Sequence, residues 1–76
     1  SCFIEVARHK SAGKAAASLG LSQPAVSKTI HELENSLNAS LFEPNRRSMV
    51  LTPLGEIFLR YATSSVTALK QGMRMV

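Results

Sequence analysis

The sequence predicts a mainly α-helical fold with one short β-hairpin and a long C-terminal helix. Apolar residues recur at helical spacing in four segments, and serine, threonine, glycine and asparagine stand where these segments begin or end. The 76 residues include no tryptophan, one tyrosine and three phenylalanines. The core is therefore expected to consist of small aliphatic side chains, which favour close packing of helices over a large β-sandwich.

The first two helices are expected at residues 2–9 and 12–19. The first ends in three basic residues, which suit the negative end of a helix dipole. Ser11 can cap the second helix by accepting a backbone hydrogen bond. Gly20 can adopt the left-handed conformation of a sharp helix exit, after which Leu21 is expected to return to the core.

A third helix is expected over residues 23–37. Ser22 can cap it, and Pro24 is tolerated in the first turn because amides there have no intrahelical partner. Asn38 is a suitable left-handed residue at its end. Four apolar residues at helical spacing predict a buried stripe: Val26, Ile30, Leu33 and Leu37.

The remaining residues predict a hairpin followed by a long helix. Short strands are expected at residues 41–43 and 49–51, around a turn-rich tip. Thr52-Pro53 then opens the last helix in the usual order of cap and proline. We interpret residues 1–51 as one domain and residues 52–76 as a linker and dimerisation helix. Its apolar stripe runs through Leu54, Phe58, Tyr61, Ser65, Leu69, Met73 and Val76.

Composition narrows the class of protein. Nine basic and five acidic residues give a net charge of +4, and 45% of residues are apolar, as in a folded, mildly basic domain. The chain is too short for most enzymes, and it has no membrane-length apolar stretch. A single cysteine suits a reducing compartment, so we expect a cytoplasmic module. Both ends lie within helical patterns, so we also expect a piece of a longer protein.

Neither a metal site nor a catalytic site is expected. Cys2, His9 and His31 are the only soft metal ligands, and they lack any paired spacing. The glutamates are not paired with a base or a nucleophile. We therefore predict no enzymatic activity, no metal and no cofactor.

The second and third helices have the spacing of a helix-turn-helix. Ala16, Gly20 and Val26 provide a small residue where the helices cross, a glycine at the turn and a β-branched plug beneath the second helix. An ordinary αα-corner would satisfy this spacing equally well. The surface of the third helix decides between the two interpretations.

The first two turns of that helix contain no acid and display Gln23, Ser27 and Lys28 beside free amides. Its two acids, Glu32 and Glu34, lie in its later half. A helix N-terminus positions phosphates, whereas Gln and Lys can read adenine and guanine edges. Each residue alone would be an ordinary solvated position. Together, next to the turn, they favour duplex DNA as the partner.

Arg46 and Arg47 form the only pair of adjacent arginines, at the predicted hairpin tip. Arginine doublets on loops are most often simply solvated. Beside a helix-turn-helix, however, this placement suits a wing that touches the DNA backbone or enters the minor groove. His31, one turn beyond Ser27, is a further candidate for a phosphate contact.

Together these features resemble the N-terminal DNA-binding region of LysR-type bacterial transcriptional regulators. The resemblance covers almost the whole chain and rests on Ala15-Ala16, Leu19, Ser22-Gln23-Pro24-Ala25-Val26-Ser27-Lys28, Ile30, Leu33-Glu34, Leu37, Leu41-Phe42-Glu43, Arg46-Arg47, Leu51-Thr52 and Gly55. It implies a winged helix-turn-helix followed by a linker helix, with a small-molecule-binding effector domain beyond this chain. It also implies DNA contacts at Ser22, Gln23, Pro24, Ser27, Lys28, Arg46 and Arg47. Pro44, Asn38 and Ala12 depart from the family pattern, and Pro44 removes a commonly basic wing residue.

The expected partners are therefore double-stranded DNA with a pseudo-palindromic site and a second copy of the chain. We expect a homodimer through the linker helix, with a tetramer as a further option for the full-length protein. Its interface would use Phe58, Tyr61, Ser65, Leu69, Met73 and Val76. A small-molecule inducer would act only through the effector domain, and no membrane is involved. The alternatives are a winged-helix module for protein contact and a basic dimerisation segment or RNA binder.

Overall fold

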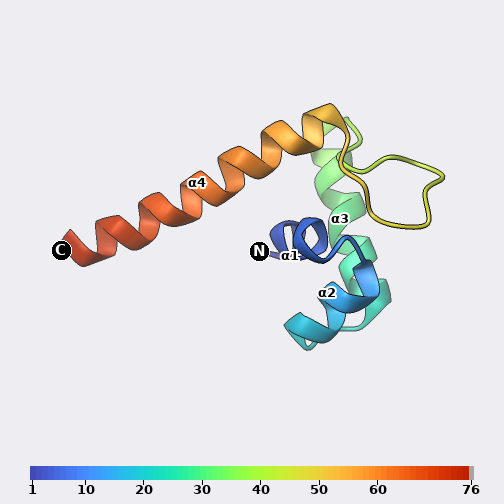
Figure 1. Cartoon of the computed structure of the whole chain (residues 1–76), viewed down its shortest axis with the longest axis horizontal. Helices are drawn as coiled ribbons and strands as arrows, with labels where there is room; N and C mark the ends of the chain where they lie inside the picture. Colours follow the sequence, from blue (N-terminus) through green and yellow to red (C-terminus); the bar gives the residue numbers. More distant parts are fainter. Residues whose placement is uncertain (76) are drawn as a thin grey trace.

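The computed structural model describes the backbone of residues 1–75 and the side chains of residues 1–64. Figure 1 shows three helices grouped at one end of the molecule, whereas the last helix runs away from them toward the C-terminus. The helices of the described residues are α1 (Cys2–His9), α2 (Ala12–Leu19), α3 (Gln23–Leu37) and α4 (Pro53–Met75). The predicted helices are therefore confirmed.

Local capping explains these bounds. The side chains of Ser11, Ser22 and Thr52 each accept a hydrogen bond from the backbone N–H three residues further on, at 3.2, 3.3 and 2.9 Å. Gly20 and Asn38 end α2 and α3 in the left-handed conformation, with φ of 68° and 52°. Both types of cap were predicted from the sequence.

The core lies where α1, α2 and α3 meet the chain segment before α4. Its ring contacts centre on Phe3, whose ring centroid lies 5.5 Å from that of Phe42 and 5.1 Å from that of Phe58. Small alanines on α2 allow α1 and α3 to approach closely. The buried residues are Phe3, Val6, Ala7, Ala15, Ala16, Val26, Ile30, Leu41 and Phe42.

Three leucines expected in the core lie elsewhere. Leu33 is only partly buried, Leu37 is 41% exposed, and Leu21 is 50% exposed. The stripe on α3 is thus buried at Val26 and Ile30, in the first half of the helix. Leu21 lies in the turn between α2 and α3, where its N–H donates to the Ala16 carbonyl at 2.9 Å while its side chain is half exposed.

The predicted hairpin is present as a loop with a single bridge. Phe42 and Leu51 form an isolated antiparallel bridge, and the N–H of Glu43 donates to the carbonyl of Val50 at 2.7 Å. The strands expected at 41–43 and 49–51 are not formed: the pairing ends after Glu43 and Val50, and residues 44–48 contain only a turn and bends. We refer to residues 42–51 as the wing.

The start of α4 packs against the chain just before the wing. A Cβ on Gly55 would overlap the carbonyl oxygen of Leu41 and would lie 3.0 Å from Leu51 Cδ2. Only glycine permits this close approach, so Gly55 fixes how α4 leaves the body. In the described part of the chain, no helix combines the length and apolar character needed to cross a membrane.

Candidate nucleic-acid interface

The first turns of α3 present a polar, acid-free surface. Gln23, Pro24 and Lys28 are exposed, and Ser27 is half-buried. Ser22 is exposed at the cap, where its side chain occupies one of the free amides at the helix start. The remaining amides and the helix dipole leave this end electropositive, which suits phosphate.

The turn between α2 and α3 has the geometry that the spacing predicted. Val26 is fully buried, Ala16 is 4% exposed, and Gly20 adopts a positive φ. Because the plug beneath α3 and the crossing point are both packed, the polar face of α3 is held outward. This arrangement is a helix-turn-helix.

Gln23 lies against the start of α2. Its side-chain oxygen would be 3.4 Å from a Cβ placed on Gly13, which is an ordinary contact distance, so the two residues are close neighbours. The first turns of α2 and α3 are therefore neighbours. Two helix starts and one long amide side chain form a continuous polar surface.

Lys28 forms a loose ion pair along its own helix. Its Nζ lies 3.9 Å from Oε1 of Glu32, and the two side chains are 80% and 65% exposed. An exposed pair of this length contributes little to stability, so the ammonium group is free to exchange Glu32 for another anion.

His31 is exposed and lines a groove between α3 and the wing. The groove has a volume of about 420 Å³. Its lining residues are Ser27, Ile30, His31, Glu34, Ser40, Phe42, Glu43, Pro44 and Met49. Ser27 and His31, one helical turn apart, thus line the side of α3 that faces the wing.

Arg46 and Arg47 are exposed near the tip of the wing. The tip is shaped by a turn at Pro44 and Asn45, and Asn45 has a φ of 63°. Among the side chains that the structure describes, neither arginine has an acidic partner within ion-pair distance. Figure 1 shows the wing as a loop that projects from the body on the side opposite to the free end of α4.

Glu34 joins α3 to the base of the wing, a role that sequence reasoning missed. Its Oε2 accepts hydrogen bonds from the N–H groups of Leu41 at 2.7 Å and Phe42 at 3.3 Å. A carboxylate that holds two amides is a strong local constraint. The only sequence signal is an acid near a helix C-terminus, where the dipole disfavours it.

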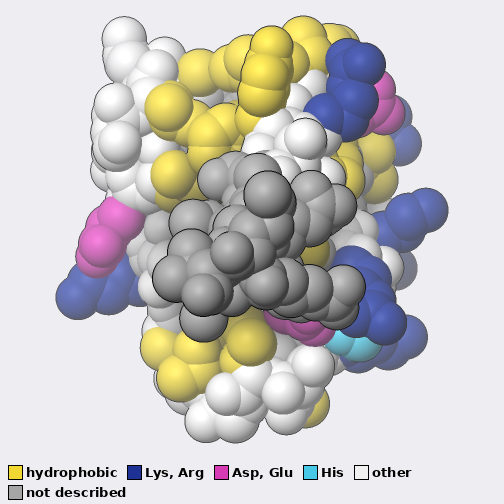
Figure 2. Space-filling view, turned by 90° about the vertical axis from the view of Figure 1, so that its left-hand side faces the viewer, with side chains coloured by type: hydrophobic (Ala, Val, Ile, Leu, Met, Phe, Trp, Pro, Cys, Tyr) yellow, Lys and Arg dark blue, Asp and Glu magenta, His cyan; other side chains and the backbone are white. Residues whose placement is uncertain are grey.

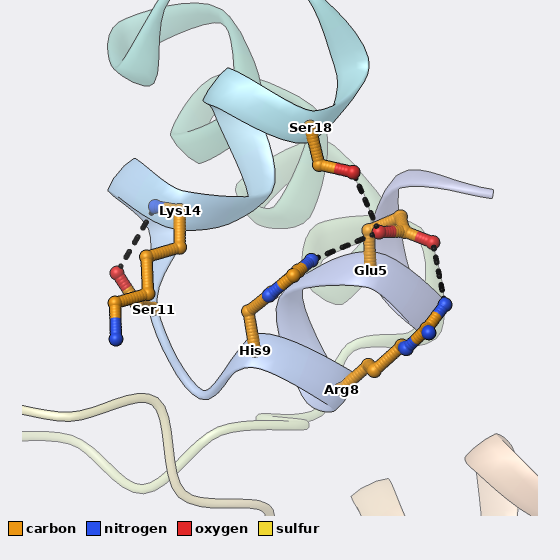
Figure 3. Close-up of polar contacts among 6 residues, drawn as sticks. All are labelled: Glu5, Arg8, His9, Ser11, Lys14 and Ser18. Atoms are coloured by element: carbon orange, nitrogen blue, oxygen red, sulfur yellow. Dashed lines mark hydrogen bonds and ion pairs between the residues drawn. The ribbon is translucent and has the colours of Figure 1, made fainter.

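A second polar cluster holds α1 to α2. Figure 3 shows Glu5 accepting from Ser18 Oγ on α2, at 3.2 Å, and facing His9 Nε2 on its own helix, also at 3.2 Å. Arg8 lies 3.8 Å from the other carboxylate oxygen. The cluster fixes α2 and serves no evident chemistry. Within the described residues, no three His, Cys, Asp or Glu side chains are placed to hold a metal ion.

Charge is unevenly distributed over the surface. In Figure 2, Lys and Arg side chains gather mainly along the right-hand edge of the view, whereas hydrophobic side chains cover much of its upper part. Basic groups gathered on part of a surface favour contact with a polyanion.

The exposed face of α4 differs from the face predicted for the dimer interface. Phe58 turns toward the body, packs edge-on against Phe3 and is partly buried, so much of its side chain is used within its own chain. On the described part of α4, the exposed large apolar residues are Leu54, Ile57 and Tyr61, at 44%, 43% and 72% exposure. Tyr61 thus remains a candidate. The side chains of Ser65, Leu69, Met73 and Val76 lie outside the described residues.

Known proteins with the same features are bacterial regulators. The model of the family described as "bacterial regulatory helix-turn-helix protein, lysR family" matches residues 1–56. The HTH-type transcriptional regulator PcaQ of Agrobacterium fabrum is 50% identical over 74 residues, which are 97% of this chain and 24% of that protein. The chain thus spans about a quarter of the length of this curated relative.

Solved structures match the fold closely. The BenM_DBD/benA site 1 DNA complex superposes with a TM-score of 0.93 and 34% identity, over 97% of this chain and 83% of that one. The CbnR_DBD–DNA complex gives a TM-score of 0.85 and 34% identity, over 96% and 85% of the two chains. Both of these structures are complexes with DNA.

Proposed function

Because the chain belongs to the lysR family of bacterial regulatory helix-turn-helix proteins, we propose that it binds duplex DNA sequence-specifically. In this proposal it is the DNA-reading part of a ligand-responsive bacterial transcriptional regulator. The observation that carries the proposal is the acid-free start of α3, where exposed Gln23 and Lys28 lie beside free amides and next to the start of α2. The DNA complexes of BenM_DBD and CbnR_DBD support it.

The proposed contacts fall into two groups. Gln23, Ser27 and Lys28 would contact base edges and phosphates in the major groove. Ser22, Pro24 and His31 would lie against the neighbouring backbone, with His31 reaching it from the groove between α3 and the wing. Arg46 and Arg47, exposed and without a described acidic partner, would contact the flanking minor groove.

We also propose a homodimer through α4, with two copies arranged around a two-fold axis on a pseudo-palindromic site. The support is the exposed stripe of Leu54, Ile57 and Tyr61 on a helix that extends away from the body. Ile57→Glu should weaken the dimer without touching the core, since Ile57 is 43% exposed. Sedimentation equilibrium of both chains tests this, and a wild-type monomer at micromolar concentration would refute the dimer.

In the longer protein, residues 1–51 would form the DNA-binding domain and residues 52–76 would connect it to an effector domain. The chain spans 24% of PcaQ. An inducer would bind in that further domain, and the regulator would act in the bacterial cytoplasm, where its DNA is. A tetramer is the further assembly to test there.

The deciding experiment is selection of bound sequences from a random duplex library, followed by titration of a selected duplex. The titration is run at two salt concentrations with single-stranded competitor. Enrichment of a two-fold symmetric sequence and a steep salt dependence are expected. Weak binding without salt dependence would instead indicate a module for protein contact, and equal competition by single strands would indicate a single-strand or RNA binder.

A further inference from the structure

Lys10 has an unusual backbone conformation. It caps α1 in the left-handed region, with φ 56° and ψ 28°, and its N–H donates to the carbonyl of Val6 at 2.9 Å. The other non-glycine residues with positive φ in the described chain are Asn38 and Asn45. Asparagine tolerates this region because its side chain hydrogen-bonds locally, whereas lysine has no such compensation. A lysine held there at a cost calls for a functional explanation.

The position of Lys10 in the fold provides that functional explanation. Its carbonyl accepts a hydrogen bond from the N–H of Met49 at 3.1 Å, which ties it to the wing. The next residue, Ser11, caps α2, and Gly13 of that helix lies against Gln23 at the start of α3. Lys10 therefore lies, exposed, at the junction between the wing and the two helix starts.

A role in stabilising α1 does not account for this lysine. Arg8 and His9 already supply positive charge to the last turn of that helix. Both lie against Glu5, at 3.8 and 3.2 Å (Figure 3). Among the described side chains, Lys10 has no acidic partner within ion-pair distance. Its ammonium group is thus available to an anion from outside the chain.

We propose that Lys10 is a further phosphate contact, which holds the sugar-phosphate backbone between the groove entered by α3 and the groove entered by the wing. The proposal rests on the DNA-binding function proposed above. It assigns to the loop between α1 and α2 a charge-based contact that carries no sequence information.

The Lys10→Gly variant distinguishes a phosphate contact from a structural role. Loss of a phosphate contact would weaken DNA binding without lowering stability, whereas loss of a structural role would lower stability. Glycine relieves the left-handed strain, so the melting temperature should equal or exceed that of the wild type. Loss of the phosphate contact should lower DNA affinity about eightfold at 0.1 M salt and should flatten the salt slope by about 0.9. Selected and random duplexes should be affected equally.

Two variants serve as matched controls. Asn38→Gly makes the same backbone change at the end of α3 without removing a charge, and DNA affinity should not change. Arg8→Gln removes one positive charge from the same helix at a residue that lies beside Glu5, and the salt slope should change by less than half as much as in Lys10→Gly.

The outcomes are separable. If the wild-type chain binds duplex DNA but Lys10→Gly matches Asn38→Gly in affinity and salt slope, the Lys10 contact is wrong while the DNA-binding function stands. A Lys10→Gly chain that melts well below the wild type would show a structural role and would also overturn the proposal. If the wild type itself shows no salt-dependent binding to duplex, the function proposed above fails first.

Discussion

The start of α3 and the wing both present polar side chains, but the two regions are held in place in different ways. The start of α3 is part of a capped helix, with Val26 fully buried beneath it and Gln23 lying on α2. The wing has one bridge, between Phe42 and Leu51, and a tip with a residue at positive φ. One surface is held by packing along its length, and the other is held mainly at its base.

This difference matches what each surface is proposed to do. Reading base edges requires hydrogen-bonding groups at fixed positions, whereas contact with phosphates requires mainly charge within reach. The base of the wing must nevertheless be held at a fixed position on the body. It is fixed by the carboxylate of Glu34 on one side and by the Lys10 carbonyl on the other.

The largest expected effect comes from a change where α4 packs against the base of the wing. Gly55→Ala would push a methyl group into the Leu41 carbonyl, beside the base of the wing, and should lower the free energy of unfolding by about 3 kcal/mol. Urea denaturation measures this. Gly13→Ala is the control, because its Cβ would meet Gln23 at an ordinary 3.4 Å and should change stability by less than about 1 kcal/mol. Equal effects of the two changes would contradict the close packing at Gly55.

The next effect concerns only the start of α3. Gln23→Ala should reduce discrimination between the selected duplex and single-base variants by ~1–3 kcal/mol at one position, because it removes a base contact. Competition titrations measure this. Asn35→Ala, on the exposed later half of the same helix, should leave discrimination unchanged. If Gln23→Ala weakens all duplexes equally, Gln23 does not read a base.

A smaller effect is expected at the base of the wing. Glu34→Gln should lower the free energy of unfolding by about 1.5 kcal/mol, since a neutral amide accepts more weakly from the two N–H groups. Hydrogen exchange at the N–H groups of Leu41 and Phe42 should accelerate. Glu32→Gln makes the same charge change at an exposed pair and should cost less than about 0.5 kcal/mol. Unchanged exchange in Glu34→Gln would show that the wing does not depend on this carboxylate.

The smallest effect belongs to the tip. Arg46→Ala should weaken binding to all duplexes alike and flatten the salt slope by about one, with no change in stability, because the side chain is exposed. Titrations at several salt concentrations test this. A changed ranking of sequences would mean that the wing also reads bases, and the contrast between the two regions would then be lost.

Sequence reasoning succeeded where structure is decided locally. The helix starts at Ser11, Ser22 and Thr52 depend on a hydrogen bond to a backbone amide three residues away, which a short motif encodes. The same holds for the left-handed ends at Gly20 and Asn38. The helix-turn-helix followed from residue types at short separations.

Prediction failed where a distant contact decides. The rotation of α4 about its axis is fixed by the approach of Gly55 to Leu41, and this turns Phe58 inward and leaves Ile57 outside. Periodicity alone gives a stripe but not the direction in which the stripe faces. Glu34 likewise finds its partners seven and eight residues further on, across a loop that no local motif describes. The roles of individual site residues in DNA binding remain predictions.

The space above Gly13 bears on how target preference can change during evolution. A Cβ at residue 13 would just reach Gln23, at 3.4 Å from its side-chain oxygen, so a side chain longer than alanine's would extend into the room that Gln23 uses. A larger residue there would redirect Gln23 without altering any residue of α3. Two relatives with identical α3 sequences could then favour different targets, so inferring a target from α3 alone would miss a determinant that lies on another helix and need never touch DNA.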